Sequence, residues 1–213
     1  MNHPTNLKNK SFAIYGLGIT GESIIKFFKK KKIKDFSLWD DDMNLRKKHK
    51  VNLSKENFKK KLENVDFILL SPGISIKNSL FKKNLEKQKN KIITDLDLLY
   101  IQNPNLKSIV VTGTNGKSTT CKLIEHLLKK SGRNVKLGGN IGKPVLTFNY
   151  SDNTIFVIEA SSFQLAHSKF IKPNYAILLN ISNDHLDWHG SYNNYINSKF
   201  KIFSFQKKKD FSL

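Results

Sequence analysis

The sequence is poor in cysteine and in long apolar runs. Its 213 residues contain one cysteine, Cys121, so the chain cannot form an internal disulfide, which fits a reducing compartment. No apolar run approaches the roughly 20 residues needed to cross a bilayer. The amino-terminal residues also lack the apolar core and cleavage site of a secretory signal. We therefore expect a cytoplasmic protein with no membrane partner.

Arginine is scarce in a chain that is strongly basic. The formal net charge is +20, and the only arginines are Arg46 and Arg133, so nearly all of the positive charge is lysine. A charge of this size suggests nucleic acid as a partner. However, base and phosphate recognition depends heavily on the planar arginine fork. Because lysine runs are usually a solvated surface, we expect no nucleic-acid partner.

Short apolar, β-branched and aromatic runs alternate with lysine-rich amphipathic segments. The pattern predicts strands at 11–16, 35–39, 65–71, 91–94, 107–113, 154–161 and 175–182, and helices at 22–31, 118–130 and 192–205. Strands separated by helices predict an α/β fold with parallel, doubly wound sheets. We expect a Rossmann-like domain over residues 1–95 and a second nucleotide-binding α/β domain over 96–213. The final QKKKDFSL resembles the start of another strand without a closing helix, so we expect the second domain to be incomplete.

The first glycine cluster is GLGITG at 16–21, placed directly after a predicted strand and opening a helix. It matches G-x-G-x-x-G, and Asp40 closes the next strand at about the spacing of a ribose-binding acid. A diphosphate would lie at the helix amino terminus. NAD is the obvious ligand, a UDP-sugar would use the same geometry, and a Rossmann-like sheet without a ligand is the third possibility.

The second glycine cluster is TGTNGKSTT at 112–120, after the strand that ends in VV. Its spacing is shorter than that of the Walker A loop, which has four residues between its first glycine and Gly-Lys-Ser/Thr. Gly113 and Gly116 free backbone amides to converge on phosphate oxygens. Lys117 supplies a charge for the terminal phosphates and Ser118 a hydroxyl for Mg²⁺. The alternative, a simple helix-capping turn, explains the hydroxyl residues but not the two glycines and the lysine. The second domain is therefore predicted to be P-loop ATPase-like.

Three later stretches could complete a Mg-ATP site. Glu159 ends a strand, His185 follows another strand in NDHLDWHG, and Lys199 lies on the next predicted helix. Taken singly, each has an ordinary interpretation as a strand end, a surface loop residue or one lysine among many. His185 and His189 are spaced like a zinc pair, but the glutamate of such a motif is missing and a glycine follows, so we discount zinc.

Together, four stretches identify the chain as a member of the Mur ligase family. They are GTNGKST (113–119), GGNIGKP (138–144), EASSFQL (159–165) and NDHLDWHG (183–190). The resemblance extends over the whole chain, although family members are roughly twice as long. The segments GNIG and SSFQL, with SPGI at 71–74, resemble those of the family members that use UDP-N-acetylmuramoyl-L-alanine and D-glutamate as substrates.

The resemblance implies a role for each matched residue. ATP phosphates would be held by Gly113, Thr114, Asn115, Gly116, Lys117, Ser118 and Thr119. Metal positions are matched by Ser118, Glu159, His185 and Lys199, and catalytic positions by Lys117, His185 and Lys199. The family carbamylates the lysine matched by Lys199, turning an ammonium into a carboxylate-like metal ligand. Positions that bind the uridine-nucleotide substrate are matched by Leu17, Gly18, Thr20, Asp40, Ser71, Gly73 and Asn140.

The resemblance also implies a reaction. ATP with Mg²⁺ would activate the L-alanyl carboxylate as an acyl phosphate, which the amine of D-glutamate then attacks in a monomeric enzyme of peptidoglycan precursor synthesis. The family's carboxy-terminal, D-glutamate-binding domain has no counterpart here, so we expect the chain to be a fragment that is inactive alone. A folylpolyglutamate-type ligase and a non-catalytic nucleotide-binding remnant are the alternatives.

Overall fold

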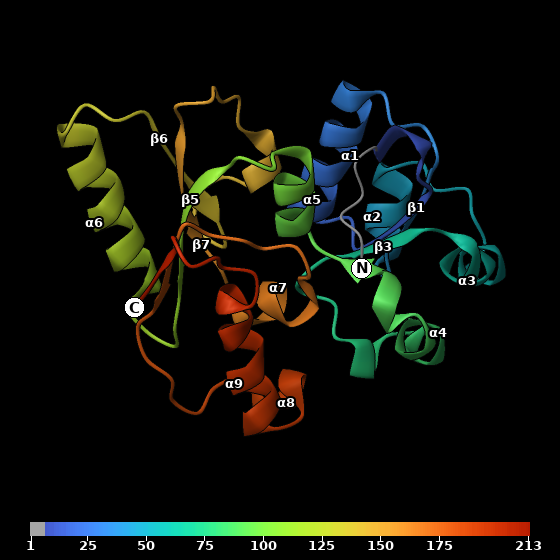
Figure 1. Cartoon of the computed structure of the whole chain (residues 1–213). Helices are drawn as coiled ribbons and strands as arrows, with labels where there is room; N and C mark the ends of the chain where they lie inside the picture. Colours follow the sequence, from blue (N-terminus) through green and yellow to red (C-terminus); the bar gives the residue numbers. More distant parts are fainter. Residues whose placement is uncertain (1–6) are drawn as a thin grey trace. The chain divides into compact units, whose positions relative to one another are not determined.

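The computed structural model describes residues 7–213. The chain divides into two compact units, Met1–Asp95 and Leu96–Leu213. Each unit is built around its own parallel sheet, with helices between successive strands (Figure 1). The predicted α/β class with parallel sheets is confirmed. No helix within the described range is both long and apolar enough to cross a membrane.

The first unit has a four-stranded sheet of order β2-β1-β3-β4. Its main elements are β1 (Phe12–Tyr15), α1 (Ile19–Lys31), β2 (Phe36–Trp39), α2 (Met43–Lys48), α3 (Lys55–Asn64), β3 (Phe67–Leu70), α4 (Lys82–Lys87) and β4 (Ile92–Ile93). After β2 the chain returns to the other side of β1, so the strand order reverses between β1 and β3. Ligands of open parallel sheets bind beyond the carboxyl ends of the strands at such a reversal.

Aromatic side chains fill the core of the first unit. Tyr15, Phe58 and Phe81 are almost completely buried, and their rings lie 5.3–6.1 Å apart between centroids. Trp39 stacks on Phe58 at 5.6 Å. Aromatic pairs at these separations add to the stabilisation from area burial alone. This packing holds the carboxyl ends of β1 and β2 in place beside helices α3 and α4.

The second unit has a five-stranded sheet of order β6-β7-β5-β8-β9. Its main elements are α5 (Asp95–Gln102), β5 (Lys107–Thr112), α6 (Lys117–Lys130), β6 (Val135–Gly139), β7 (Ile155–Glu159), α7 (Ser162–His167), β8 (Tyr175–Leu178), α8 (Leu186–His189), α9 (Tyr192–Phe200) and β9 (Phe211–Ser212). Strand β5 is central, so the loops after β5, β7 and β8 emerge side by side at one edge of the sheet.

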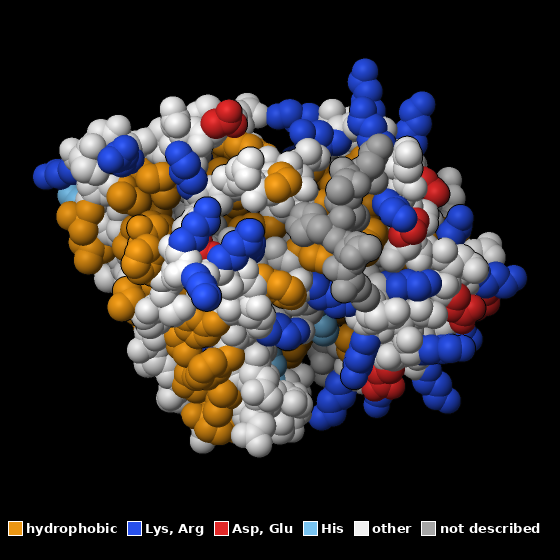
Figure 2. All heavy atoms as spheres, viewed as in Figure 1, with side chains coloured by type: hydrophobic (Ala, Val, Ile, Leu, Met, Phe, Trp, Pro, Cys, Tyr) orange, Lys and Arg blue, Asp and Glu red, His pale blue; other side chains and the backbone are white. Residues whose placement is uncertain are grey.

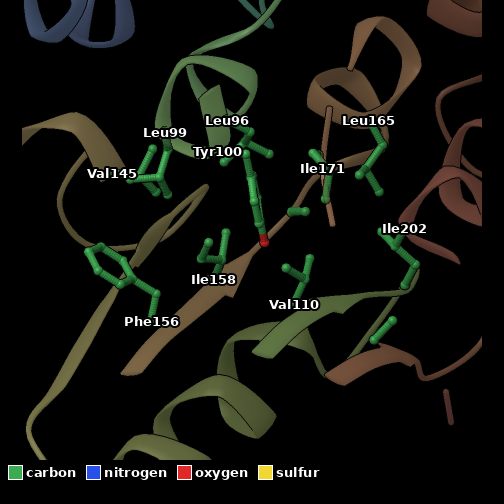
Figure 3. Close-up of a cluster of buried hydrophobic side chains, with 12 residues drawn as sticks. Leu96, Leu99, Tyr100, Val110, Val145, Phe156, Ile158, Leu165, Ile171 and Ile202 are labelled. Carbon is green, nitrogen blue, oxygen red and sulfur yellow. The ribbon is translucent and has the colours of Figure 1, made fainter. Parts of the chain in front are cut away.

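Alternate residues of the central strands enter two different cores, as expected for a parallel sheet covered on both faces. On one face, Val110 and Ile158 pack with Tyr100 of α5 and Leu165 of α7 (Figure 3). On the other, Val111 and its neighbours pack against α6 through Cys121, which is fully buried. Both faces of the sheet are therefore covered by packed side chains next to the loop that follows β5.

The helix predicted at 192–205 is shorter in the structure. Helix α9 ends at Phe200, and a 3-10 turn, Lys201–Phe203, follows it. That turn buries Ile202 in the core, while the Lys201 ammonium donates a hydrogen bond to the Ala166 carbonyl. Tertiary contacts therefore convert the end of the predicted α-helix into a tighter 3-10 turn.

Figure 2 shows the lysine side chains on one face of the protein. On the face shown in Figure 2 they are separated by uncharged atoms, and apolar side chains gather over α6, where Leu123 and Leu127 are exposed. A dispersed distribution is typical of a solvated basic surface.

Candidate active site

The loop between β5 and α6 has the form of an anion-binding turn. Gly116 is the residue before α6, with φ of 83°, and no side chain caps the helix start. This left-handed conformation favours glycine. The amino-terminal amides of α6 have no side-chain cap, and the helix dipole favours an anion at this end. The simple capping turn considered from the sequence is not what forms.

Lys117 folds back over this loop. Its ammonium donates hydrogen bonds to the carbonyl oxygens of Gly113 at 2.9 Å and Thr114 at 2.6 Å. Two of its three donors are thereby used to hold the charge beside the turn. The positive charge of Lys117 is therefore held against the predicted phosphate loop.

Two residues that sequence reasoning missed hold the loop from neighbouring elements. Asn180, after β8, accepts the amide hydrogens of Thr114 through its backbone oxygen and of Asn115 through its side chain, at 3.0 and 2.9 Å. Tyr195 of α9 shares a 2.8 Å hydrogen bond with the Thr114 hydroxyl. The signal for Asn180 is its place after a strand adjacent to β5, since carboxyl ends of parallel strands share one edge.

Glu159 lies at the same edge, at the end of β7, and only 2% of its surface is exposed. One carboxylate oxygen accepts a hydrogen bond from the Ser118 hydroxyl at 2.7 Å, and the other from the Asn140 side-chain amide at 2.8 Å. None of the ion pairs within residues 7–213 involves Glu159. A buried carboxylate with only neutral partners is costly unless a cation joins it.

The Ser118 and Glu159 oxygens fit Mg²⁺, which takes a few hard oxygen ligands from protein and keeps the rest for phosphate and water. No cluster of three or more His, Cys, Asp or Glu side chains suited to a metal occurs in the described part of the chain. Any metal bound by Ser118 and Glu159 would need its other ligands from a phosphate group or water.

Lys199 is brought to the phosphate loop by α9. Its ammonium donates to the Gly113 carbonyl at 2.7 Å, lies 4.6 Å from the centre of the Tyr195 ring, and is 2% exposed. Burial first and the nearby charge of Lys117 second lower the pKa of this lysine to about 8, while Asp184 opposes the shift. A lysine in this environment has a much larger neutral, nucleophilic fraction near neutral pH than an ordinary lysine.

The two histidines of the NDHLDWHG stretch are in different environments. His185 has φ of 52° and lies 3.3 Å from an Asp184 oxygen, with almost half of its side chain exposed. His189 is buried, and its Nε2 is 3.0 Å from the Ser162 hydroxyl. Burial lowers the pKa of His189 to about 4, so its ring is neutral. His189 therefore joins α8 to α7, and the metal role of His185 stays a prediction.

In the first unit, the glycine cluster forms a tight turn after β1. Gly16 has φ of 100°, and a Cβ there would lie 2.5 Å from the Ser71 Cβ. The Ser71 hydroxyl donates to the Gly16 carbonyl at 2.9 Å. Gly18 has open space around its α-carbon. The turn therefore needs glycine at 16 and leaves the backbone at 18 accessible to a ligand.

Asp40 fastens this turn. Its two carboxylate oxygens accept the backbone amides of Leu17 at 2.6 Å and Asp42 at 2.8 Å. The acid therefore organises the loops after β1 and β2. Leu17 is fully buried, and its amide is held by Asp40.

The other predicted substrate positions of this unit lie at the same carboxyl edge. Thr20 is half-buried in the first turn of α1, and Gly73 is exposed after β3. Asn140, by contrast, lies in the second unit with its amide on Glu159. The geometry thus groups six of the seven predicted substrate residues at one sheet edge.

Two models of Mur ligase domains match the chain. The MurD-like N-terminal domain matches residues 10–93, and the Mur ligase middle domain matches residues 111–213. The chain belongs to the Mur ligase family. The Mur ligase resemblance of the sequence is thereby confirmed.

Curated relatives of this Mur ligase chain are named UDP-N-acetylmuramoylalanine--D-glutamate ligase. The protein of Wolbachia pipientis wMel is 41% identical over 202 residues, covering 92% of this chain and 39% of the relative. The protein of Rickettsia prowazekii is 38% identical over 216 residues, covering 97% and 46%. This chain therefore spans less than half the length of these relatives.

A solved Mur ligase shares the fold. The crystal structure of UDP-N-acetylmuramate:L-alanyl-gamma-D-glutamyl-meso-diaminopimelate ligase from Neisseria meningitides has a TM-score of 0.55 at 18% identity, covering 95% of this chain and 70% of that one. At this identity the likeness concerns the fold alone.

Proposed function

We propose that this chain provides the uridine-nucleotide site, the ATP phosphate loop and the metal ligands of a cytoplasmic, ADP-forming ligase. The ligase joins D-glutamate to UDP-N-acetylmuramoyl-L-alanine in peptidoglycan precursor synthesis. The names of the Wolbachia and Rickettsia relatives support this substrate pair. The observation that most supports this function is the hydrogen bond between Ser118 of the phosphate loop and the buried Glu159.

In the proposed reaction, the L-alanyl carboxylate attacks the terminal phosphorus of ATP, giving an acyl phosphate and ADP. The amine of D-glutamate then attacks the acyl carbon, and phosphate leaves from the tetrahedral intermediate. Lys117 and the amides at the start of α6 orient the phosphates and offset charge that gathers during transfer. Bound Mg²⁺, held by Ser118 and Glu159, would neutralise charge on the transferred phosphoryl group.

Lys199 is proposed to be carbamylated. Its neutral amine, favoured by a pKa lowered to about 8, is the form that attacks CO₂. The carbamate would exchange the positive charge beside Lys117 for a negative one that can approach a metal with His185. NMR with ¹³C-bicarbonate would detect the carbamate carbon in the wild-type chain, and a signal that persists in Lys199→Met would assign it to another lysine.

In the first unit, the proposed site for the uridine nucleotide is the carboxyl edge formed by residues 16–20, Asp40 and residues 71–73. We propose a monomer with no nucleic-acid or membrane partner. Equilibrium titration of the chain with Mg-ATP and with UDP-N-acetylmuramoyl-L-alanine tests the function. Saturable binding of both is expected. Binding of ATP alone would favour a nucleotide-binding remnant, and binding of a folate-type substrate in place of the uridine nucleotide would favour the related ligase class.

A further inference from the structure

The most detailed unassigned feature of the site is the contact between Asn140 and Glu159. From the sequence, Asn140 matched a substrate contact. In the structure, its side-chain amide donates to a Glu159 carboxylate oxygen at 2.8 Å, and its backbone amide donates to the Glu159 carbonyl at 2.8 Å. Asn140 therefore forms hydrogen bonds with both the backbone and the side chain of Glu159, whose carboxylate also contacts the phosphate loop.

The strand register explains how these two hydrogen bonds form. Gly139 of β6 pairs with Glu159 of β7, so Asn140 follows directly beyond the paired position. Gly139 has φ of 109°, and a Cβ there would lie 2.3 Å from the Glu159 carbonyl oxygen. Only glycine lets the chain turn this closely over β7. The end of β6 is thus shaped to bring the Asn140 amide onto Glu159.

The two carboxylate oxygens of Glu159 therefore have different hydrogen-bond partners. The Asn140 amide holds one oxygen, and the other points to the Ser118 hydroxyl of the phosphate loop. Outer partners that hold one oxygen of a ligating carboxylate fix the direction of the other. We propose that Asn140 is a positioning residue that orients Glu159 toward the divalent cation bound with ATP. This inference rests on the proposed function and assigns Asn140 to the metal site.

The chain contains a matched control for Asn140. Asn134 precedes β6, and its side-chain amide donates to the Thr154 hydroxyl at 3.0 Å, just before β7 begins. It joins the same two strands at their other end, away from Glu159. Asn134→Ala removes an equivalent strand contact without touching the carboxylate.

The test measures ATP binding to the full chain at increasing Mg²⁺ and, separately, without divalent cation. Asn140→Ala is expected to raise the half-saturating Mg²⁺ concentration about 10–100-fold, with Mg²⁺-free ATP affinity unchanged. Asn134→Ala should leave both values at the wild-type level. In a Glu159→Gln background, Asn140→Ala should produce little further change in the Mg²⁺ requirement, because its effect passes through the carboxylate.

Each other result has a definite meaning. An unchanged Mg²⁺ requirement in folded Asn140→Ala would overturn the inference while leaving the proposed function intact. Equal effects of Asn134→Ala and Asn140→Ala would reduce the contact to strand pairing and also overturn it. A wild-type chain that binds ATP without any response to Mg²⁺ would overturn the proposed metal site and the inference together.

Discussion

Lys117 and Lys199 donate hydrogen bonds to the same atom, the carbonyl oxygen of Gly113, at 2.9 and 2.7 Å. Two ammonium groups therefore meet at one point of the phosphate loop. Lys199 has the more buried environment, and its pKa is lowered to about 8 by burial first and by the charge of Lys117 second. Such crowding of positive charge destabilises the chain unless an anion binds or one lysine loses its charge.

The lowered pKa of Lys199 predicts how stability depends on pH. Between the folded value of about 8 and the ordinary value of 10.5, the unfolded chain binds the proton and the folded chain does not. Stability therefore rises with pH across this window, and below it the full penalty remains. The free energy of unfolding of wild type relative to Lys199→Met should rise by about 3 kcal/mol across the window.

Urea unfolding at several pH values in CO₂-free buffer measures this difference. Lys122 is exposed on α6, so the same comparison with Lys122→Met should show no such slope. A wild-type minus Lys199→Met difference that stays flat from pH 8 upward would mean that Lys199 keeps an ordinary pKa.

Removing the phosphate-loop lysine should weaken ATP binding selectively. Lys117→Ala deletes a charge-assisted contact worth about 1.5–3 kcal/mol, which corresponds to a roughly ten- to hundredfold loss of affinity. Lys122→Ala removes the same charge from the exposed face of the same helix and should change affinity little. Calorimetric titration with ATP checks both variants, and equal losses would identify Lys117 as ordinary surface charge.

The sharp turn at Gly139 should tolerate no side chain. Gly139→Ala combines a left-handed φ of 109° with a Cβ only 2.3 Å from the Glu159 carbonyl oxygen. Gly132→Ala has a left-handed φ of 76° with open space around the new Cβ, so it isolates the conformational cost. That cost is about 1–2 kcal/mol, and we expect Gly139→Ala to lose about 2 kcal/mol more because backbone must move. Similar unfolding midpoints in urea for the two variants would contradict the expected clash with the Glu159 carbonyl.

Local sequence signals predicted the phosphate loop well. β-Branched residues, two glycines and an amphipathic segment follow one another within residues 107–130, so strand, turn and helix could each be recognised without tertiary information. The same holds for the turn at Gly16 after β1. The parallel arrangement of the sheets then followed from the alternation of strands and helices.

Elements defined by tertiary contacts were not predicted. Strand β6, Val135–Gly139, ends in two glycines and becomes a strand through its pairing with β7. Helix α5, Asp95–Gln102, is buried almost all round, so it has no polar face to reveal a helical period. The Asn140–Glu159 contact depends on that unpredicted strand, which is why the sequence suggested a different partner for Asn140.

The geometry at Asp40 predicts which nucleotide the first unit accepts. A dinucleotide site of the NAD type uses the acid after the second strand to bind ribose hydroxyls. Here both oxygens of Asp40 already accept backbone amides, from Leu17 and Asp42. These hydrogen bonds fix the carboxylate in the glycine turn and Asp40 is only 7% exposed, which limits its access to a ribose, whereas a uridine diphosphate can be bound through the exposed backbone at Gly18.

We therefore expect the chain to bind UDP and UDP-N-acetylmuramoyl-L-alanine, and not NADH. Titrations followed by calorimetry compare the three ligands under one set of conditions. Asp40→Asn retains the shape but can accept fewer of the two amides, so it should weaken UDP binding and lower the free energy of unfolding by about 1–3 kcal/mol. Asp35, exposed just before β2, provides the control, because Asp35→Asn alters the same charge away from the turn. Saturable NADH binding with no response to UDP would show that this edge of the sheet binds a dinucleotide and would contradict the expectation.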